Sequence, residues 1–247
     1  MRIAVAGGTG QAGSAAVRSA RERGHEVIVL SRSAGVDLVT GVGAEAVLDG
    51  IDAVIDASGS GAKDVPSEFH EAVIRTLVRA RPRQLVVLSI VNCDRVEGFP
   101  LYAGKLAQER AAEASGVPFT IARTTQFHEF AAQIWRMGAR GPLHFSPRMR
   151  TQPVSVREVG ARLVSLAEAG PVERAADFAG PQEESLLEMV RSYARATTAG
   201  RFVIPIKLGG DFGRAQRDGR LLPGSDAELG SETFSKWLAA TAATSQF

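Results

Sequence analysis

Short apolar runs alternate with helix-like patterns along the first half of the chain. Five runs rich in Val, Ile, Leu and Ala are predicted strands: residues 2–6, 26–30, 52–57, 84–89 and 118–122. Three segments with apolar side chains at helical spacing are predicted helices: residues 11–23, 68–79 and 102–114. Because strands and helices alternate, the pattern predicts the α/β class, with a parallel sheet that carries helices on both faces.

The second half of the chain is less regular. A capping-box pattern from Ser155 to Glu158 opens a predicted helix, which ends at Gly170-Pro171. The other predicted elements are strands at residues 175–179 and 201–206, and helices from 185 to about 199 and over 231–240. We divide the chain into a core, residues 1–125, and a smaller lobe, residues 126–247, of which about 151–180 return to the core.

A glycine motif lies at the turn between the first predicted strand and the first predicted helix. Its glycines form a GxxGxxG pattern at positions 7, 10 and 13. In a dinucleotide-binding turn, the first glycine allows a sharp bend, the second lets backbone approach pyrophosphate, and the third lets the helix pack closely. The N–H groups that open the helix, with its dipole, hold the phosphates. The motif predicts a dinucleotide site made by Gly7, Thr9, Gly10, Gln11, Ala12 and Gly13.

The residues after the second predicted strand indicate which dinucleotide is preferred. An acidic residue at this place binds the adenosine 2′-hydroxyl, whereas an arginine accommodates a 2′-phosphate. The sequence offers Ser31-Arg32-Ser33 and no carboxylate before Asp37. Arg32 can form a charge-assisted pair with a phosphate, and Ser33 can add a hydroxyl. NADP is therefore predicted in preference to NAD.

Several segments together resemble a known family. They are residues 7–13, 31–33, 35–41, 88–91 and 122–127, with 232–239 near the end of the chain. These segments are similar to those of atypical short-chain dehydrogenase/reductases, and most of all to the bacterial NmrA-like, NAD(P)H-binding members. The resemblance implies a Rossmann-type doubly wound parallel sheet with a small C-terminal substrate lobe. It also implies reductase chemistry on a carbonyl compound, a quinone or an activated alkene.

The same resemblance implies roles for individual residues. Asp37 would lie near the adenine, and Ala57-Ser58-Gly59 would pass the adenosine ribose. Lys105 would reach the nicotinamide ribose. The segment from Thr124 to Phe127, which includes Gln126, would flank the nicotinamide.

The catalytic pattern of that superfamily is broken in this chain. Its standard members use Tyr-x-x-x-Lys, in which the lysine lowers the pKa of the tyrosine so that the phenol can pass a proton. Here Leu101 lies four residues before Lys105, and Tyr102 lies three residues before it. On a helix, side chains at neighbouring positions point in directions about 100° apart. Tyr102 is therefore either a displaced proton donor or a packing residue at the start of the helix.

Two further side chains are candidates for proton transfer or substrate contact. Ser89 ends a predicted strand at the carboxyl edge, where open α/β sheets bind ligands. His128 follows the 124–127 segment, and its alternatives are an acid–base role and ordinary packing. Cys93 has no basic neighbour in the sequence, which predicts an inert thiol. The histidines are too far apart to indicate a metal site; they are His25, His70, His128 and His144.

Composition and charge narrow the function classes. The 247 residues are 45% hydrophobic and 23% charged, which is typical of globular proteins. No apolar run approaches the ~18 residues of a membrane span, and no export signal is indicated. A single cysteine fits a reducing compartment, so a cytoplasmic protein is predicted. With a net charge of +2 and two tryptophans, the chain offers no stacking platform for nucleic acid.

Two functions stay open on the sequence. The first is an NADPH-dependent oxidoreductase that acts on a small molecule without the usual tyrosine, as a monomer or homodimer. The second is a non-catalytic NAD(P)-binding sensor that regulates a partner. Lys105 and the 124–127 segment favour the enzyme, whereas the displaced tyrosine favours the sensor.

Overall fold

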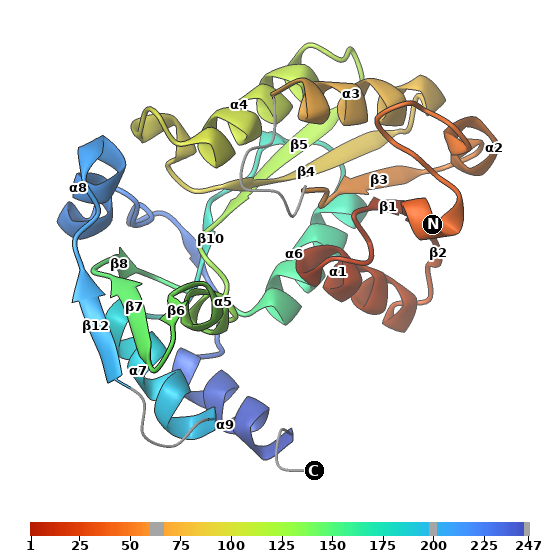
Figure 1. The fold of residues 1–247 in the computed structure, drawn as a ribbon. Coiled ribbons are helices and arrows are strands. Elements are labelled where there is room, and N and C mark those ends of the chain that lie inside the picture. The colour runs from red at the N-terminus through yellow and green to blue at the C-terminus, as the bar shows by residue number, and fades with distance from the viewer. Residues whose placement is uncertain (60–66, 198–201, 245–247) are drawn as a thin grey trace. The chain divides into compact units, whose positions relative to one another are not determined.

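The chain folds into two units, which a computed structural model describes at residues 1–59, 67–197 and 202–244 (Figure 1). The first unit comprises residues 1–94, 99–124 and 156–176. The second comprises residues 95–98, 125–155 and 177–247. Residues 156–176 thus belong to the same unit as the N-terminal half of the chain.

A parallel sheet forms the centre of the first unit. Its strands are β1 (Arg2–Ala6), β2 (Glu26–Leu30), β3 (Ala53–Asp56), β4 (Gln84–Ile90) and β5 (Phe119–Thr124). They lie in the order β5-β4-β3-β1-β2, and the short β9 (Glu173–Arg174) pairs with β5. The order reverses between β1 and β3, and ligands bind at such a reversal, outside the carboxyl ends of the strands. The prediction of a Rossmann-type α/β fold is confirmed.

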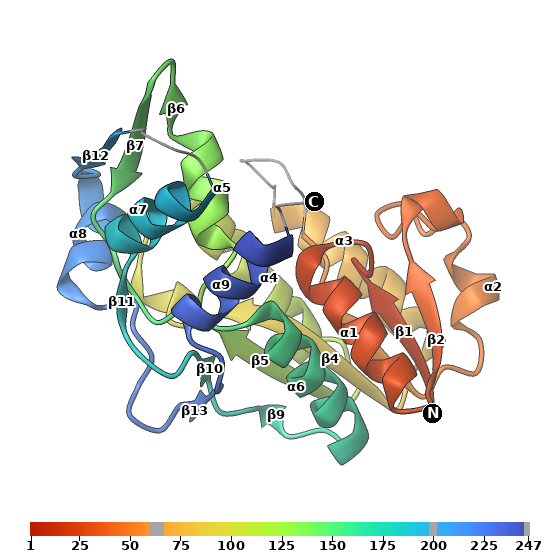
Figure 2. The same cartoon turned by 90° about the horizontal axis from the view of Figure 1, so that it is seen from below.

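Helices cover both faces of this sheet. On one face lie α1 (Gln11–Glu22) and α6 (Val156–Ala169), side by side in Figure 2. On the other lie α3 (Ser67–Leu77) and α4 (Pro100–Glu113) (Figure 1). A Cβ on Gly160 of α6 would lie 2.4 Å from the Ala15 carbonyl carbon, so the contact between α1 and α6 requires a glycine. The unit also contains α2 (Ala44–Leu48), η1 (Arg32–Ala34) and η2 (Val78–Ala80), with the first two residues of η3 (Cys93–Arg95).

Side-chain alternation along the strands decides which residues meet α4. Val54 of β3 and Val87 of β4 belong to one core cluster together with Ala112 of α4. Because successive side chains of a strand point to opposite faces, Asp56 shares the face of Val54, and Ser89 shares that of Val87. The polar side chains of Asp56 and Ser89, at the carboxyl ends of β3 and β4, therefore face α4.

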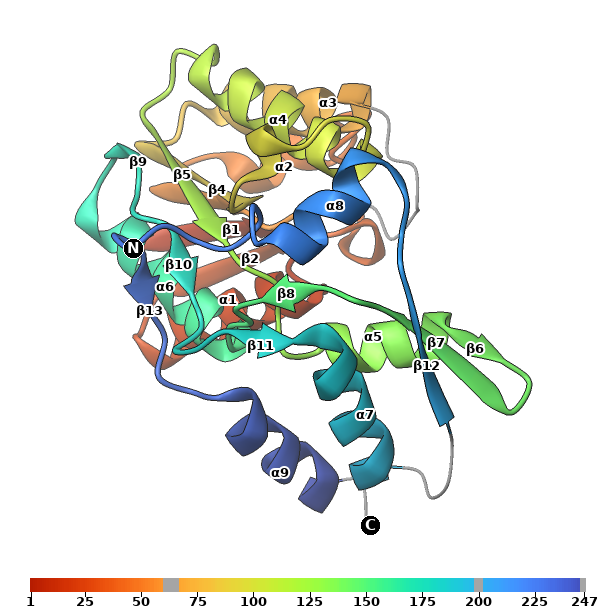
Figure 3. The ribbon, with the colours of Figure 1, turned by 90° about the vertical axis from the view of Figure 1, so that its left-hand side faces the viewer.

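The second unit contains short strands and four described helices (Figure 3). β7 (Leu143–Pro147) pairs with β6 (Ala139–Arg140) and β12 (Phe202–Ile206), and β8 (Arg150–Thr151) pairs with β11 (Glu184–Ser185). β10 (Phe178–Ala179) pairs with β13 (Glu228–Leu229). The helices are α5 (Phe130–Met137), α7 (Leu186–Thr197), α8 (Gly210–Asp218) and α9 (Phe234–Thr244). α7 packs on α5 and α9.

Some predicted boundaries differ from the structure. The strand predicted to end at Ala122 continues to Thr124, because the charge of Arg123 is neutralised by Glu109 of α4. The strand predicted over 175–179 is only the two residues of β10, and α5 and α8 were not predicted at all. The expected end of a helix near 199 and the start of a strand at 201 lie outside the described residues. Of the helices that the structure describes, none is both long and apolar enough to span a membrane.

Candidate functional site

The glycine loop between β1 and α1 forms a cradle. Gly7 has a φ of 70°, and a Cβ there would lie 2.5 Å from the Ala57 carbonyl oxygen. A Cβ on Gly13 would lie 2.1 Å from the Gly7 oxygen, so neither position admits a side chain. A Cβ on the exposed Gly10 would approach only the Gly7 oxygen, at 3.2 Å, among the described residues. Close backbone contacts within the protein therefore require glycine at positions 7 and 13, whereas Gly10 faces open space.

The first turn of α1 has backbone N–H groups without a capping side chain. Gly10 is the N-cap, makes no side-chain cap hydrogen bond, and is followed by no acidic residue in the first turn. Thr9 and Gln11 are exposed on either side of it, and Ala12 is buried. The N–H groups and the helix dipole favour an anion at this end of the helix.

The loop after β2 presents a cation. Arg32 is the first residue of η1 and is exposed. The hydroxyls of Ser31 and Ser33, on either side of it, lie 3.0 Å apart within hydrogen-bond distance. Within the described part of the chain, no carboxylate forms an ion pair with Arg32, so its guanidinium can pair with an external anion.

Asp37, further along the same loop, stabilises its own turn. Its carboxylate accepts hydrogen bonds from the backbone N–H groups of Thr40, at 3.2 Å, and Val39, at 2.8 Å. These two bonds, with a smaller contribution from the charge of Arg32, hold the pKa of Asp37 below its usual value.

Lys105 lies at the carboxyl ends of β3 and β4. Its Nζ donates hydrogen bonds to the Leu88 carbonyl oxygen at 2.9 Å, to Gln108 Oε1 at 2.8 Å and to the Ser58 carbonyl oxygen at 3.4 Å. Gln108 Nε2 in turn donates to Asp56 Oδ2 at 2.6 Å. Burial lowers the pKa of Lys105, and the negative charge of Asp56 opposes that effect.

The segment after β3 contributes the hydroxyl of Ser58. Ser58 N–H donates to Asp56 Oδ1 at 2.9 Å, and Ala57 N–H donates to the Ala6 oxygen at 3.1 Å. The Ser58 hydroxyl is buried and has no hydrogen-bond partner among the described residues. A Cβ on Gly59 would meet nothing within 4 Å in that part of the chain. A buried hydroxyl close to Lys105 can therefore bond to a ligand.

His70 of α3 is a buried, neutral neighbour of this group. Burial, and then the charge of Lys105, lowers its pKa to about 4, while Asp56 acts in the opposite direction. Its Nδ1 has no hydrogen-bond partner among the described residues. At neutral pH His70 carries no charge.

Tyr102 is buried at the start of α4. Its ring meets that of Phe99 edge to face, with centroids 5.0 Å apart. Burial, and then the nearby Cys93, raises the pKa of the phenol. A tyrosine activated by a lysine has a lowered pKa, so the direction here is the opposite. Leu101, at the position four before Lys105, is exposed.

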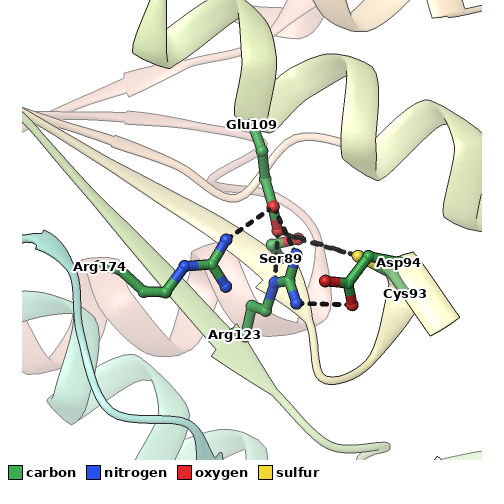
Figure 4. Close-up of polar contacts among 6 residues, drawn as sticks. All are labelled: Ser89, Cys93, Asp94, Glu109, Arg123 and Arg174. Carbon is green, nitrogen blue, oxygen red and sulfur yellow. Dashed lines mark hydrogen bonds and ion pairs between the residues drawn. The ribbon is translucent and has the colours of Figure 1, made fainter.

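Ser89 belongs to a buried ionic cluster (Figure 4). Its hydroxyl donates to Glu109 Oε1 at 2.5 Å, and the same carboxylate accepts two bonds from Arg123, from Nε at 2.8 Å and from Nη2 at 2.7 Å. Arg174 lies 3.3 Å from Glu109, and Arg123 Nη1 donates to Asp94 at 2.9 Å. Burial acts to raise the pKa of Glu109, but these hydrogen bonds outweigh it and lower the pKa. The Ser89 proton is thus directed at Glu109.

Cys93 lies at the edge of the same cluster. Its Sγ is 3.9 Å from Glu109 Oε1 and 3.9 Å from the Ser89 hydroxyl. Burial, and then the charge of Glu109, raises the pKa of the thiol to about 11. A thiol in this state is protonated and weakly nucleophilic.

The 124–128 segment crosses from the first unit to the second. Thr124 ends β5, is buried, and accepts a hydrogen bond from Val91 N–H at 3.0 Å. In the second unit, Gln126 Oε1 accepts from the Thr151 hydroxyl at 2.7 Å, and Phe127 forms a parallel bridge with Val154.

His128, also in the second unit, is fully buried beside α9. Its Nε2 lies 3.0 Å from the Glu232 carbonyl oxygen, and its ring packs on those of Phe234 and Trp237. These contacts connect the 124–128 segment to the C-terminal helix.

A family model described as NAD(P)H-binding matches residues 7–169, about two thirds of the chain. The chain belongs to this NAD(P)H-binding family. The resemblance to atypical short-chain dehydrogenase/reductases is confirmed. The Photosystem II assembly factor Ycf39 of Synechocystis sp. is 30% identical in an alignment of 186 residues, and the match covers 63% of this chain and 56% of that protein. The aligned region thus spans little more than half of that relative.

Solved structures with the same fold include NADP(H)-bound and NAD-bound proteins. A triphenylmethane reductase from Citrobacter sp., complexed with NADP(H), has a TM-score of 0.74 and 16% identity over 98% of this chain and 100% of that chain. An NADPH-dependent quinone oxidoreductase from Escherichia coli has a TM-score of 0.75 and 15% identity over 97% of this chain and 99% of that chain. The enzyme WbmH of Bordetella bronchiseptica, in complex with NAD+, has a TM-score of 0.69 and 15% identity over 98% of this chain and 97% of that chain.

The first unit of this NAD(P)H-binding protein fits the dinucleotide. The cradle excludes side chains at Gly7 and Gly13, the α1 N–H groups lack a cap, and the Ser58 hydroxyl lacks a partner among the described residues. Sequence reasoning missed three residues that accept hydrogen bonds from candidate site residues: Asp56 from Ser58, Gln108 from Lys105 and Glu109 from Ser89. A signal for Glu109 was its place four residues after Lys105, on the same helix face.

Proposed function

We propose that this protein is an NADPH-dependent reductase of a small carbonyl compound, quinone or activated alkene. The observation that carries the proposal lies at the carboxyl edge of β3 and β4, where the Lys105 ammonium is held by the Ser58 and Leu88 carbonyl oxygens and the Ser58 hydroxyl has no partner in the described part of the chain. When bound, NADPH supplies a hydride to the substrate. The α1 N–H groups and Gly10 bind its pyrophosphate, Arg32 and Ser33 the 2′-phosphate, and Lys105 the nicotinamide ribose.

Proton delivery sets the substrate class in this proposal. The Tyr102 phenol is buried against Phe99, and the Ser89 hydroxyl donates to Glu109, so neither is a ready acid. A positioned acid contributes about 10²–10⁴-fold to reductions that need one. Quinones and conjugated acceptors need it least, because their reduced oxygens are stabilised without an acid. We expect NADPH oxidation with quinones and enones and little with unactivated ketones. Absence of turnover across such a panel would refute the reductase.

A non-catalytic NAD(P)-binding sensor is the second candidate. It is favoured by Leu101 at the usual place of the tyrosine, and by the assembly-factor name of a relative that is 30% identical. A sensor of this kind binds NADPH tightly enough to raise the melting temperature, but it oxidises NADPH with no member of the panel. The turnover measurement therefore separates the two candidates.

Replacing Arg32 by alanine is expected to weaken NADPH binding about tenfold to a hundredfold and NADH binding far less. The reason is the loss of one charge-assisted bond to the 2′-phosphate, worth ~1.5–3 kcal/mol. Calorimetric titration with both dinucleotides makes the comparison. Arg83→Ala removes an equally positive side chain at the amino end of β4 and serves as the control. Equal losses for both dinucleotides in Arg32→Ala would overturn the NADP preference.

Tyr102→Phe is expected to leave NADPH binding unchanged and to lower turnover by less than about tenfold, the effect of one ordinary hydrogen bond. The measurement is the pH dependence of turnover beside wild type. A thousandfold loss, with disappearance of an ionisation, would identify Tyr102 as the acid. Leu101→Tyr places a phenol four residues before Lys105 and is expected to give weak ketone reduction.

A further inference from the structure

A chain of buried polar groups runs beneath α4 in the first unit. Asp56 and Gln108 are fully buried, and Lys105 is 8% exposed. The Asp56 carboxylate, the Gln108 amide and the Lys105 ammonium are joined in that order by hydrogen bonds of 2.6 and 2.8 Å. Buried groups of this kind are costly unless each is paired, so the three side chains depend on one another.

The bonding pattern allows only one orientation of the amide. An ionised carboxylate only accepts hydrogen bonds, and an ammonium only donates them. Gln108 must therefore turn its NH₂ group to Asp56 and its oxygen to Lys105. The second oxygen of Asp56 is already held by Ser58 N–H at 2.9 Å. Asp56 thus decides which end of the Gln108 amide faces Lys105.

Several elements act on the charge of Lys105. Burial has the largest effect and lowers the pKa of the lysine. Asp56 of β3 opposes it most, followed by Cys93 of η3 and Glu109 of α4. His70 of α3 is neutral at pH 7, because burial and the lysine charge lower its pKa. Asp56 is therefore the chief counter-charge to the buried lysine.

We propose that Asp56 and Gln108 are positioning residues, which hold the Lys105 ammonium in one orientation at the carboxyl edge of β3 and β4. The contact of Lys105 with the nicotinamide ribose, on which their use in binding rests, belongs to the proposed function. The positioning itself acts in the free protein as well. It can be measured there without any turnover.

The test exchanges the carboxylate and the amide. In Asp56→Asn alone, either the Gln108 NH₂ meets another NH₂, or it turns away and leaves Lys105 without its side-chain acceptor. In Gln108→Glu alone, two carboxylates face each other. The double variant Asp56→Asn/Gln108→Glu restores every bond. The new amide oxygen at position 56 accepts from Ser58 N–H, its NH₂ donates to the new carboxylate at position 108, and that carboxylate accepts from Lys105.

The readout is the titration of Lys105 by NMR of the free protein labelled with ¹³Cε-lysine. The chain has four lysines, at positions 63, 105, 207 and 236, so Lys105→Met assigns the signal. Asp56→Asn is expected to lower the titration midpoint by about one unit or more, as the loss of a close opposite charge does. NADPH affinity is expected to fall about tenfold, and the double variant to return to within about twofold of wild type.

Gln84 supplies the matched control. It is a second buried amide, on the first residue of β4. Its Nε2 donates to the Thr120 hydroxyl at 3.0 Å and to the Leu166 carbonyl oxygen at 3.1 Å. Gln84→Leu is expected to lower stability without changing the titration midpoint of Lys105. Gln108→Leu is expected to lower stability and also to change that midpoint. If the titration midpoint of Lys105 in Asp56→Asn and in Gln108→Leu is the same as in Gln84→Leu, the positioning role is wrong. The role is also overturned if the double variant folds but its Lys105 titration midpoint and NADPH affinity are no closer to wild type than those of the worse single variant. Failure of the quinone and enone panel, with these results intact, would refute only the reductase.

Discussion

Arg123→Met is expected to lower the free energy of unfolding by about 3–5 kcal/mol, because it leaves the Glu109 carboxylate buried without its main counter-charge. The side chains of Arg123 and Glu109 are only 6% and 3% exposed. The pair joins β5 to α4, and Asp94 and Arg174 extend it to η3 and β9 (Figure 4). Chemical denaturation of wild type and variant measures the difference.

Arg150→Met is the matched control. Arg150 forms the same two-bond pair with Glu183, at 2.6 and 2.9 Å, but the two side chains are 48% and 42% exposed. Solvent screens such a pair, so the loss is expected to be far smaller. In Arg123→Met/Glu109→Leu no charge of this pair remains buried, and stability is expected to exceed that of Arg123→Met. Equal losses in the buried and exposed single variants would contradict this account.

The stabilisation by Glu109 has a defined pH dependence. Burial acts to raise its pKa in the folded protein, but the hydrogen bond from Arg123 leads the opposing effects, and the pKa is lowered from 4.5. A lowered folded pKa contributes stability above the unfolded value, and that stability is lost as the pH falls through the folded pKa. In Arg123→Met the effect of burial remains without its main opposing bond, so the pKa of Glu109 is expected to be raised in the variant. The stability difference between wild type and Arg123→Met is therefore expected to shrink as the pH falls from that raised pKa to the lowered pKa of wild type.

Gly10→Val is expected to abolish dinucleotide binding while the protein still folds. Gly10 has φ −80° and ψ 176°, which a branched residue adopts readily, and its Cβ would approach only the Gly7 oxygen among the described residues. The valine methyl groups would fill the space where the backbone meets pyrophosphate. Binding is expected to fall by more than about a hundredfold, measured as loss of the NADPH-induced rise in melting temperature.

Gly209→Val makes the same change at a matched position. Gly209 is the N-cap of α8, with φ −79° and ψ −175°, and its Cβ would meet nothing within 4 Å among the described residues. This variant is expected to keep full NADPH binding. If folded Gly10→Val is still stabilised by NADPH, the loop does not hold the pyrophosphate.

Local patterns predicted the first unit far better than the second. The strands of the parallel sheet are buried on both faces and are therefore nearly continuous apolar runs, which sequence reasoning finds easily. α5 and α8 lie in the segments 127–149 and 206–222 and are only 8 and 9 residues long, so their apolar positions repeat over too short a window to predict a helix. Their contacts with other parts of the second unit stabilise them, and such contacts leave little local signal.

Local residue types were enough to predict the glycine cradle between β1 and α1. The strand, the glycine turn and the helix all lie within the first 22 residues, and each is decided by its own residue types. Arg32 was equally visible, because it closely follows a strand whose end the pattern marks.

The contacts beneath α4 depend on the three-dimensional fold. Gln108 bonds to Asp56 across 52 residues, and Arg123 bonds to Glu109 across 14. The surroundings of Tyr102 depend on the fold in the same way, because the side-chain directions on α4 follow from how the helix is rotated against the sheet. Pairings between distant residues depend on the whole fold, and no local spacing of residues specifies them.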